Sequence, residues 1–138
     1  FWATRDAAAE FKAVLGPHAS YDIGLPVAAM DDYARDCRTA LAEPLPGCIS
    51  FFYGHIADGN MHIISLVPGA AEQPFDAMDE TVYRLVRRHG GTVSAEHGIG
   101  IKKKPYLPYA RSEPELALMR RLKAALDPEN LLNPGKVV

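Results

Sequence analysis

A short polar stretch between two apolar runs constrains this chain more than any other feature. Residues 54–62 read Gly-His-Ile-Ala-Asp-Gly-Asn-Met-His, with Cys-Ile-Ser-Phe-Phe-Tyr before them and Ile-Ile-Ser-Leu-Val after them. An Asp-Gly pair between two such runs is a strong signal for a β-hairpin with a tight turn. We therefore expect antiparallel strands near residues 48–56 and 61–67, joined at Asp58 and Gly59.

The hairpin brings two histidines of this stretch together. If Asp58 and Gly59 are the two centre residues of the turn, His55 directly faces His62. Opposed residues on an antiparallel ladder have Cβ atoms about 5 Å apart and side chains on one face. Two such imidazoles can bind one metal ion through bonds of about 2.0–2.1 Å. A loop of three or four residues would shift the pairing, and two histidines that merely end their strands are the alternative interpretation.

The patterns on either side of the hairpin give a familiar order of elements. Residues 21–27 alternate as in a short strand, and residues 27–42 have the apolar spacing of an amphipathic helix. A second helix is expected over 75–89, ending at a glycine pair, and a fourth short strand over 92–95. Strand, helix, strand, strand, helix, strand is the split βαβ order of the ferredoxin-like fold. The sequence therefore predicts an α+β domain whose antiparallel sheet has helices on one face.

Both ends of the chain are expected to be helical. Residues 1–15 carry apolar side chains near helical spacing. Ser112 followed by Glu115 has the capping-box pattern that begins a helix, and a turn-rich tail follows that helix. We expect a ferredoxin-like domain over 1–97 and a small helical subdomain over 98–138.

Composition and charge exclude several classes of protein. The net charge of -2 gives no electrostatic basis for binding nucleic acid, and no apolar run has the roughly 20 residues of a transmembrane helix. Cys37 and Cys48 form neither a CxxC pair nor a disulfide framework, which favours a cytoplasmic location. Peripheral membrane association is left open. A first residue of Phe1 is compatible with a piece of a longer polypeptide.

Glu96 is the candidate third ligand for the histidine pair. It lies on or just after the expected fourth strand and precedes Gly98 and Gly100, which allow close approach of the backbone. Two histidines and one glutamate leave an open coordination position, as in catalytic metal sites. Adjacent strand residues point to opposite faces, so His97 is better suited to act as a general base than as a second ligand from this segment. An ordinary loop histidine is the alternative for His97.

Two other groups of charged residues have a plain interpretation. The lysine run at 102–104 is most simply a solvated face, with an anionic partner or a cofactor phosphate as the alternative. Arg5, on the pattern alone, is a solvated surface charge.

Three motifs occur in a specific order along the chain. They are GHIADGNMH at 54–62, SAEHGIG at 94–100 and NPGK at 133–136. Together they resemble the C-terminal part of the FAD-linked 2-hydroxy-acid dehydrogenases, which include D-lactate dehydrogenases, glycolate oxidase subunits and D-2-hydroxyglutarate dehydrogenases. The resemblance covers essentially the whole chain. It implies a substrate or cap domain, with FAD held mainly by a separate N-terminal domain that this sequence lacks, so the chain alone is expected to be inactive.

The resemblance also assigns roles to individual residues. It makes His97 the acceptor of the substrate's hydroxyl proton and Arg5 the partner of the substrate carboxylate, a role suited to a guanidinium group. Asn133 lies in the tail expected to approach the flavin. The implied ligands of a divalent metal, usually zinc, manganese or iron, are His55, His62 and Glu96.

The implied reaction oxidises a 2-hydroxy acid to a 2-oxo acid. The metal lowers the pKa of the substrate hydroxyl, His97 takes its proton, and hydride passes to the flavin. Members that act on a second, distal carboxylate are expected to have a basic residue where this chain has Ser20 and a polar residue where it has Ile64. We therefore predict a monocarboxylic, lactate- or glycolate-like substrate rather than 2-hydroxyglutarate.

Two other functions fit the same residues. A non-catalytic ferredoxin-like module could use the histidines structurally, for assembly or ligand sensing. A metal-dependent hydrolase could use a two-histidine, one-glutamate site to activate water. The electron acceptor is unknown from the sequence, and a homodimer is left open.

Overall fold

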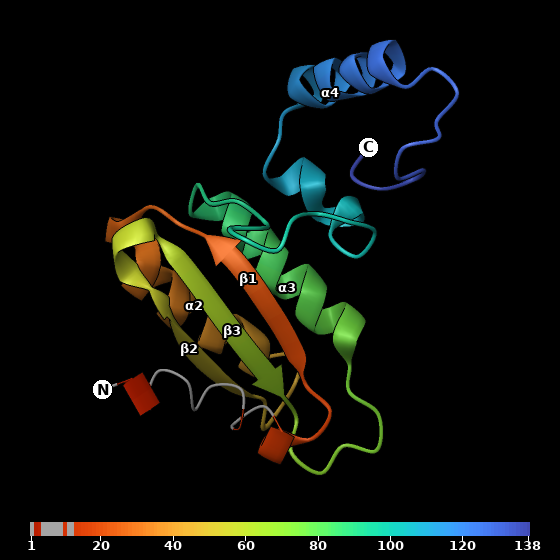
Figure 1. The fold of residues 1–138 in the computed structure, drawn as a ribbon. Coiled ribbons are helices and arrows are strands. Elements are labelled where there is room, and N and C mark those ends of the chain that lie inside the picture. The colour runs from red at the N-terminus through yellow and green to blue at the C-terminus, as the bar shows by residue number, and fades with distance from the viewer. Residues whose placement is uncertain (1, 4–9, 11–12) are drawn as a thin grey trace.

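A three-stranded antiparallel sheet lies at the centre of the computed structural model, which describes residues 2–3, 10 and 13–138 (Figure 1). The strands are β1 (Ala19–Gly24), β2 (Ile49–His55) and β3 (Asn60–Leu66), and their order in the sheet is β1-β3-β2. The hairpin of β2 and β3 is therefore confirmed, with β1 against its second strand.

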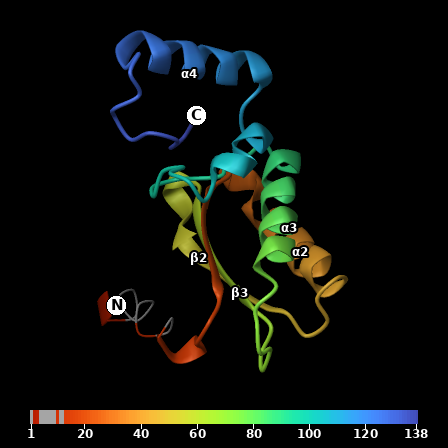
Figure 2. The same cartoon turned by 90° about the vertical axis from the view of Figure 1, so that its right-hand side faces the viewer.

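Two helices cover one face of this sheet, as the view after a quarter turn shows (Figure 2). They are α2 (Met30–Ala42), which follows a short 3₁₀ turn at Val27–Ala29, and α3 (Phe75–Arg88). The fully buried core between sheet and helices includes Ile23, Ile63 and Val82. The predicted α+β class, with helices on one face of an antiparallel sheet, is confirmed.

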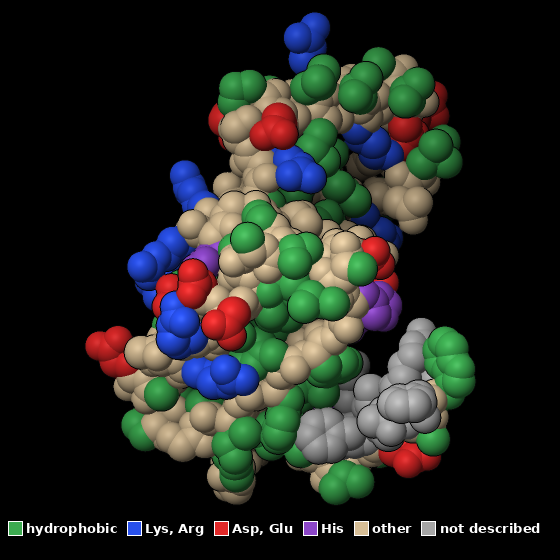
Figure 3. Space-filling view, turned by 90° about the vertical axis from the view of Figure 1, so that its left-hand side faces the viewer, with side chains coloured by type: hydrophobic (Ala, Val, Ile, Leu, Met, Phe, Trp, Pro, Cys, Tyr) green, Lys and Arg blue, Asp and Glu red, His purple; other side chains and the backbone are tan. Residues whose placement is uncertain are grey.

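The C-terminal part of the chain is helical, and its last helix stands apart from the sheet (Figure 1). It comprises a 3₁₀ segment at Lys104–Tyr109 and α4 (Glu113–Leu126). The predicted capping box is present, because Glu115 accepts hydrogen bonds from the backbone N–H and the hydroxyl of Ser112, both at 2.7 Å. Apolar side chains of α4 reach the surface in the space-filling view (Figure 3). A domain boundary near residue 97 stays a prediction.

The predicted fourth strand is wrong. Residues 92–95 form only one bridge, in which Thr92 and Gly24 exchange backbone hydrogen bonds of 3.0 and 2.8 Å. The bridge lies beside β1, where a ferredoxin-like fourth strand would begin. The next backbone N–H groups bond to a side chain instead of to a neighbouring strand, so the ladder stops.

The predicted register of the hairpin is also wrong. The loop has four residues rather than two: a 3₁₀ turn at Ile56–Asp58, then Gly59 at φ 67°. His55 therefore faces Asn60, and Tyr53 faces His62. A shift of two residues keeps each side chain on its face of the sheet, whereas a shift of one would reverse it. His55 and His62 thus stay neighbours, diagonally rather than directly.

The predicted N-terminal helix over 1–15 falls largely outside the described residues. Short helical stretches are described at 2–3 and 13–15. Among the helices that the structure describes, none is long and apolar enough to cross a membrane.

The two cysteines should differ in reactivity because they differ in burial. Cys37 is fully buried on α2, and burial raises the pKa of its thiol to about 12, whereas Cys48 is partly exposed. Only the thiolate reacts, and at pH 8 a pKa of about 12 leaves roughly one thiol in ten thousand ionised. In a Cys48→Ser variant, the native protein should react with a disulfide reagent only after urea is added. Burial also raises the pKa of Cys48, but its thiol is partly exposed, so a folded Cys37→Ala variant should react without urea. Equal rates in the two folded variants would contradict this packing.

Candidate active site

The two hairpin histidines lie on the sheet face that points away from α2 and α3. Their ring centroids are 5.9 Å apart and the rings are nearly perpendicular. Tyr53, opposite His62 in the ladder, packs against the His62 ring with the ring centroids 5.3 Å apart. Burial is the main cause that lowers the pKa of His62, against the opposing influence of nearby carboxylates. A neutral imidazole is the form that binds a metal.

Glu96 meets both histidines with separate carboxylate oxygens. Its Oε1 is 3.3 Å from His55 Nδ1, and its Oε2 is 4.0 Å from His62 Nε2. Ligand atoms around a tetrahedral ion with bonds of 2.0–2.1 Å are about 3.4 Å apart. The residue types therefore suit a divalent metal, but the two contacts use different carboxylate oxygens, so the side chains would have to move before all three could bind one ion. The structure brings together all three residues that the sequence predicted as ligands.

His97 approaches the same place. Its ring stacks on that of His62, with centroids 5.8 Å apart, and its side chain is 62% exposed. The expectation that Glu96 and His97 point to opposite faces is wrong, because residues 94–97 are not a strand and strand alternation does not apply to them. Its exposure leaves the His97 ring accessible from solvent, and its role as a base stays a prediction.

Asp22 is the site residue that the sequence analysis missed. It lies opposite His62 in the β1–β3 ladder, is 1% exposed, and accepts hydrogen bonds from the backbone N–H groups of residues 95–97. Burial acts to raise the pKa of Asp22, but these N–H groups, Lys103 and Ser94 hold it well below its usual range. The available signal was an acidic residue in a strand, beside the strand that carries His62.

Lys103 is not part of a solvated face. Its side chain is 12% exposed, and its ammonium donates to Asp22 Oδ2 at 3.3 Å and to Ser94 Oγ at 2.9 Å. Burial lowers the pKa of Lys103, against the attraction of Asp22. The lysine run is therefore divided, with Lys102 exposed and Lys103 turned inward.

A second set of possible metal ligands overlaps the first. One ligand atom each from Asp22, His62 and His97 lies within 4.8 Å of the others. The Asp22 carboxylate, however, already accepts several hydrogen bonds, and the Lys103 ammonium lies 3.3 Å from Oδ2. Most of those donors bond to Oδ2, and a metal bound by Asp22 would lie close to the Lys103 ammonium, whose positive charge opposes its binding.

The remaining predicted site residues are not brought to the histidines by the described structure. Arg5 lies outside the described residues. Asn133 is exposed in a tail turn at φ 50°, and that tail returns to the loop after His97 through a hydrogen bond from Val137 N–H to Gly100 O at 2.9 Å.

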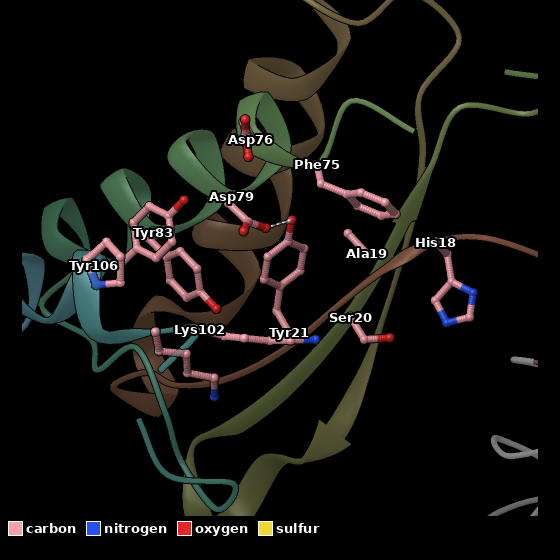
Figure 4. A pocket seen from close by; sticks show the side chains of 12 residues that line it. His18, Ala19, Ser20, Tyr21, Phe75, Asp76, Asp79, Tyr83, Lys102 and Tyr106 are labelled. Carbon is pink, nitrogen blue, oxygen red and sulfur yellow. Dashed lines mark hydrogen bonds between the residues drawn. The ribbon is translucent and has the colours of Figure 1, made fainter. Parts of the chain in front are cut away.

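A cavity of about 590 Å³ is lined by residues of β1, of α3 and of the segment 102–106 (Figure 4). Tyr21, whose hydroxyl donates to Asp79 at 2.8 Å, lines it together with the stacked rings of Tyr83 and Tyr106. None of the three predicted metal ligands is among its lining residues, but Lys103, which bonds to Asp22, is one of them.

Comparison with known proteins identifies the family. The family described as FAD linked oxidases, C-terminal domain, matches residues 1–137. D-2-hydroxyglutarate dehydrogenase of Xanthomonas citri pv. viticola is 38% identical over 99% of this chain and 30% of its own length. The mitochondrial D-2-hydroxyglutarate dehydrogenase of Rattus norvegicus is 36% identical over 99% of this chain and 25% of its own length. The chain thus spans roughly a quarter to a third of these relatives, and it belongs to the family of FAD-linked oxidase C-terminal domains.

Proposed function

We propose that this chain is the substrate domain of an FAD-dependent dehydrogenase that oxidises a 2-hydroxy acid to a 2-oxo acid. The observation that carries the proposal is the convergence of Glu96 on His55 and His62, with His97 stacked beside them. The relatives named D-2-hydroxyglutarate dehydrogenase support the reaction class.

His55, His62 and Glu96 would hold a divalent metal, with zinc the first choice and manganese or iron the others. Once bound there, the metal would act as a Lewis acid toward the substrate's hydroxyl oxygen. Neutral imidazoles and a carboxylate suit each of these ions, so the residues alone do not select one.

The protein's own groups would bind the substrate and move its proton. His97 would accept the hydroxyl proton from the exposed side of the site, and Arg5 would bind the substrate carboxylate. FAD, held mainly by another domain of the same polypeptide, would accept the hydride. Asn133 is proposed to approach that flavin from the C-terminal tail.

The substrate is proposed to be monocarboxylic, like lactate or glycolate. Ser20 and Ile64, the two departures noted in the sequence, are register partners in the β1–β3 ladder and share the sheet face of His62. Ile64 is fully buried and Ser20 is exposed, so this pair offers a hydroxyl but no cation to a second carboxylate. The names of the relatives favour the dicarboxylate, which makes this the sharpest point to test.

A substrate panel on the polypeptide that joins this chain to its FAD domain tests the proposal. We expect a higher kcat/KM for lactate or glycolate than for D-2-hydroxyglutarate. Ser20→Lys should raise kcat/KM for the dicarboxylate by about 10-fold, the worth of one hydrogen bond to a charged group. Thr39→Lys on the exposed surface of α2 is the control and should change nothing. A wild-type preference for the dicarboxylate would overturn the monocarboxylic assignment.

The cytoplasm is the proposed compartment. The two free cysteines in the described chain are compatible with a reducing environment. The relative from Rattus norvegicus is named as mitochondrial, so the location needs its own measurement in cells.

A further inference from the structure

Asp22 connects the two halves of the candidate site. Through the ladder it is paired with His62, and its Oδ1 lies 4.0 Å from His62 Nδ1. Through its other oxygen it contacts the segment that carries Glu96 and His97. One buried carboxylate thus touches both the strand of one candidate ligand and the loop of another.

The loop curls around this carboxylate. Backbone N–H groups of Ala95, Glu96 and His97 donate to Oδ2 at 3.2, 3.1 and 2.9 Å, and the Ser94 hydroxyl donates at 3.0 Å. In a strand, successive N–H groups point in alternate directions, so three consecutive ones cannot share an acceptor. Asp22 therefore takes the place of the missing strand pairing and sets the path of the loop.

Lys103 compensates the buried charge. Its ammonium donates to the Asp22 side chain at 3.3 Å, to the Asp22 carbonyl at 3.1 Å and to the Ser94 hydroxyl at 2.9 Å. Hydrogen bonds to an ionised group are roughly twice as strong as neutral ones. The negative charge of Asp22 is therefore what makes it an effective anchor for several donors.

We propose that Asp22, paired with Lys103, is a positioning residue that holds the 94–97 loop so that Glu96 and His97 turn toward His62. Asp22 is not itself a metal ligand in this proposal. The part of this inference that concerns metal rests on the proposed function, because it takes Glu96 as a ligand. The hydrogen bonds by which Asp22 holds the 94–97 loop do not require a metal.

Amide hydrogen exchange of the metal-free 138-residue chain tests the hold directly. Asp22→Asn keeps the size of the side chain and one acceptor oxygen but removes the charge. Exchange at residues 95–97 should become about 10-fold faster or more. The Thr92 amide, bonded to Gly24 O, serves as an internal reference and should keep its rate. Unchanged exchange at 95–97 would overturn the proposal.

Lysine variants separate positioning from folding. Lys103→Met should speed exchange of the same amides by a smaller factor, and Lys103→Arg should restore protection because it keeps a cationic donor. Lys102→Met removes an exposed neighbouring charge and is the matched control. If Asp22→Asn does not fold, the Met and Arg variants at 103 carry the same test, and equal exchange in both would contradict the role.

Metal binding gives the second readout. Zn²⁺ affinity should fall about 10- to 100-fold in Asp22→Asn and about 10-fold in Lys103→Met, as for other outer-shell changes, with recovery in Lys103→Arg. The visible spectrum of bound Co²⁺ should change in the weakened variants, which a purely structural role would not require. Equal affinity in wild type and Asp22→Asn would overturn positioning. If the wild type binds no Zn²⁺, the proposed function fails while hydrogen exchange still decides the hold on the loop.

Discussion

Replacing His62 with glutamine should weaken Zn²⁺ binding by about 100-fold or more. Changes outside the ligand shell already cost 10- to 100-fold in affinity, and a direct ligand contributes at least as much. His62 is a neighbour of both other candidate ligands: its ring centroid is 5.9 Å from that of His55, and its Nε2 is 4.0 Å from Glu96 Oε2. Its lowered pKa also means that little protonation competes with metal at neutral pH. Isothermal titration of the purified chain measures the affinity.

The control for that experiment is another histidine. His18 bonds to Gly16 O at 2.6 Å and makes no described contact with the ligand triad, so His18→Gln should bind Zn²⁺ like the wild type. Glu96→Gln should resemble His62→Gln. Equal Zn²⁺ affinities in wild type and His62→Gln would show that the metal, if bound, lies elsewhere.

Gly59→Ala should lower the free energy of unfolding by about 3 kcal/mol. Gly59 has φ 67°, where an L-residue costs roughly 1–2 kcal/mol. A Cβ there would also lie 2.2 Å from the carbonyl oxygen of Leu25, whose N–H donates to Gly59 O at 2.8 Å. The backbone at Leu25 and at Gly59 must move apart to admit the methyl group. This weakens the hydrogen bond that joins the hairpin tip to Leu25. Urea denaturation followed by circular dichroism gives the change.

Gly69→Ala is the matched control for the steric part. Gly69 has φ 76°, similar to Gly59, but a Cβ there meets nothing within 4 Å. Its substitution should therefore cost only the conformational part, about 1 kcal/mol. Equal losses at the two glycines would mean that the close approach to Leu25 does not hold the hairpin tip.

The hairpin shows which features could be predicted from the sequence alone and which could not. Apolar runs and the Asp-Gly pair predicted both strands and placed both histidines on one face. They did not fix the loop length, since Ile56–Asp58 forms a 3₁₀ turn that delays Gly59 to the fourth loop position. The register error of two residues did not change the predicted face of either histidine, because side chains on a strand point to the same face every two residues.

The loop at 94–97 shows where the sequence falls short. The sequence predicted a short strand over 92–95, but one carboxylate on β1 accepts hydrogen bonds from the three consecutive N–H groups of residues 95–97 and prevents it. Such a contact joins residues more than 70 positions apart, and no local pattern encodes it. For the same reason Lys103 could not be distinguished from its exposed neighbour Lys102.

Anomalous scattering from a Zn²⁺-loaded crystal of the chain tests the central claim most directly. Data collected on both sides of the zinc absorption edge locate the ion and its ligand atoms. We expect one peak bound by His55, His62 and Glu96, with Asp22 still bonded to the N–H groups of the neighbouring loop. A peak bound by Asp22 in place of Glu96, or no peak at the hairpin, would contradict it.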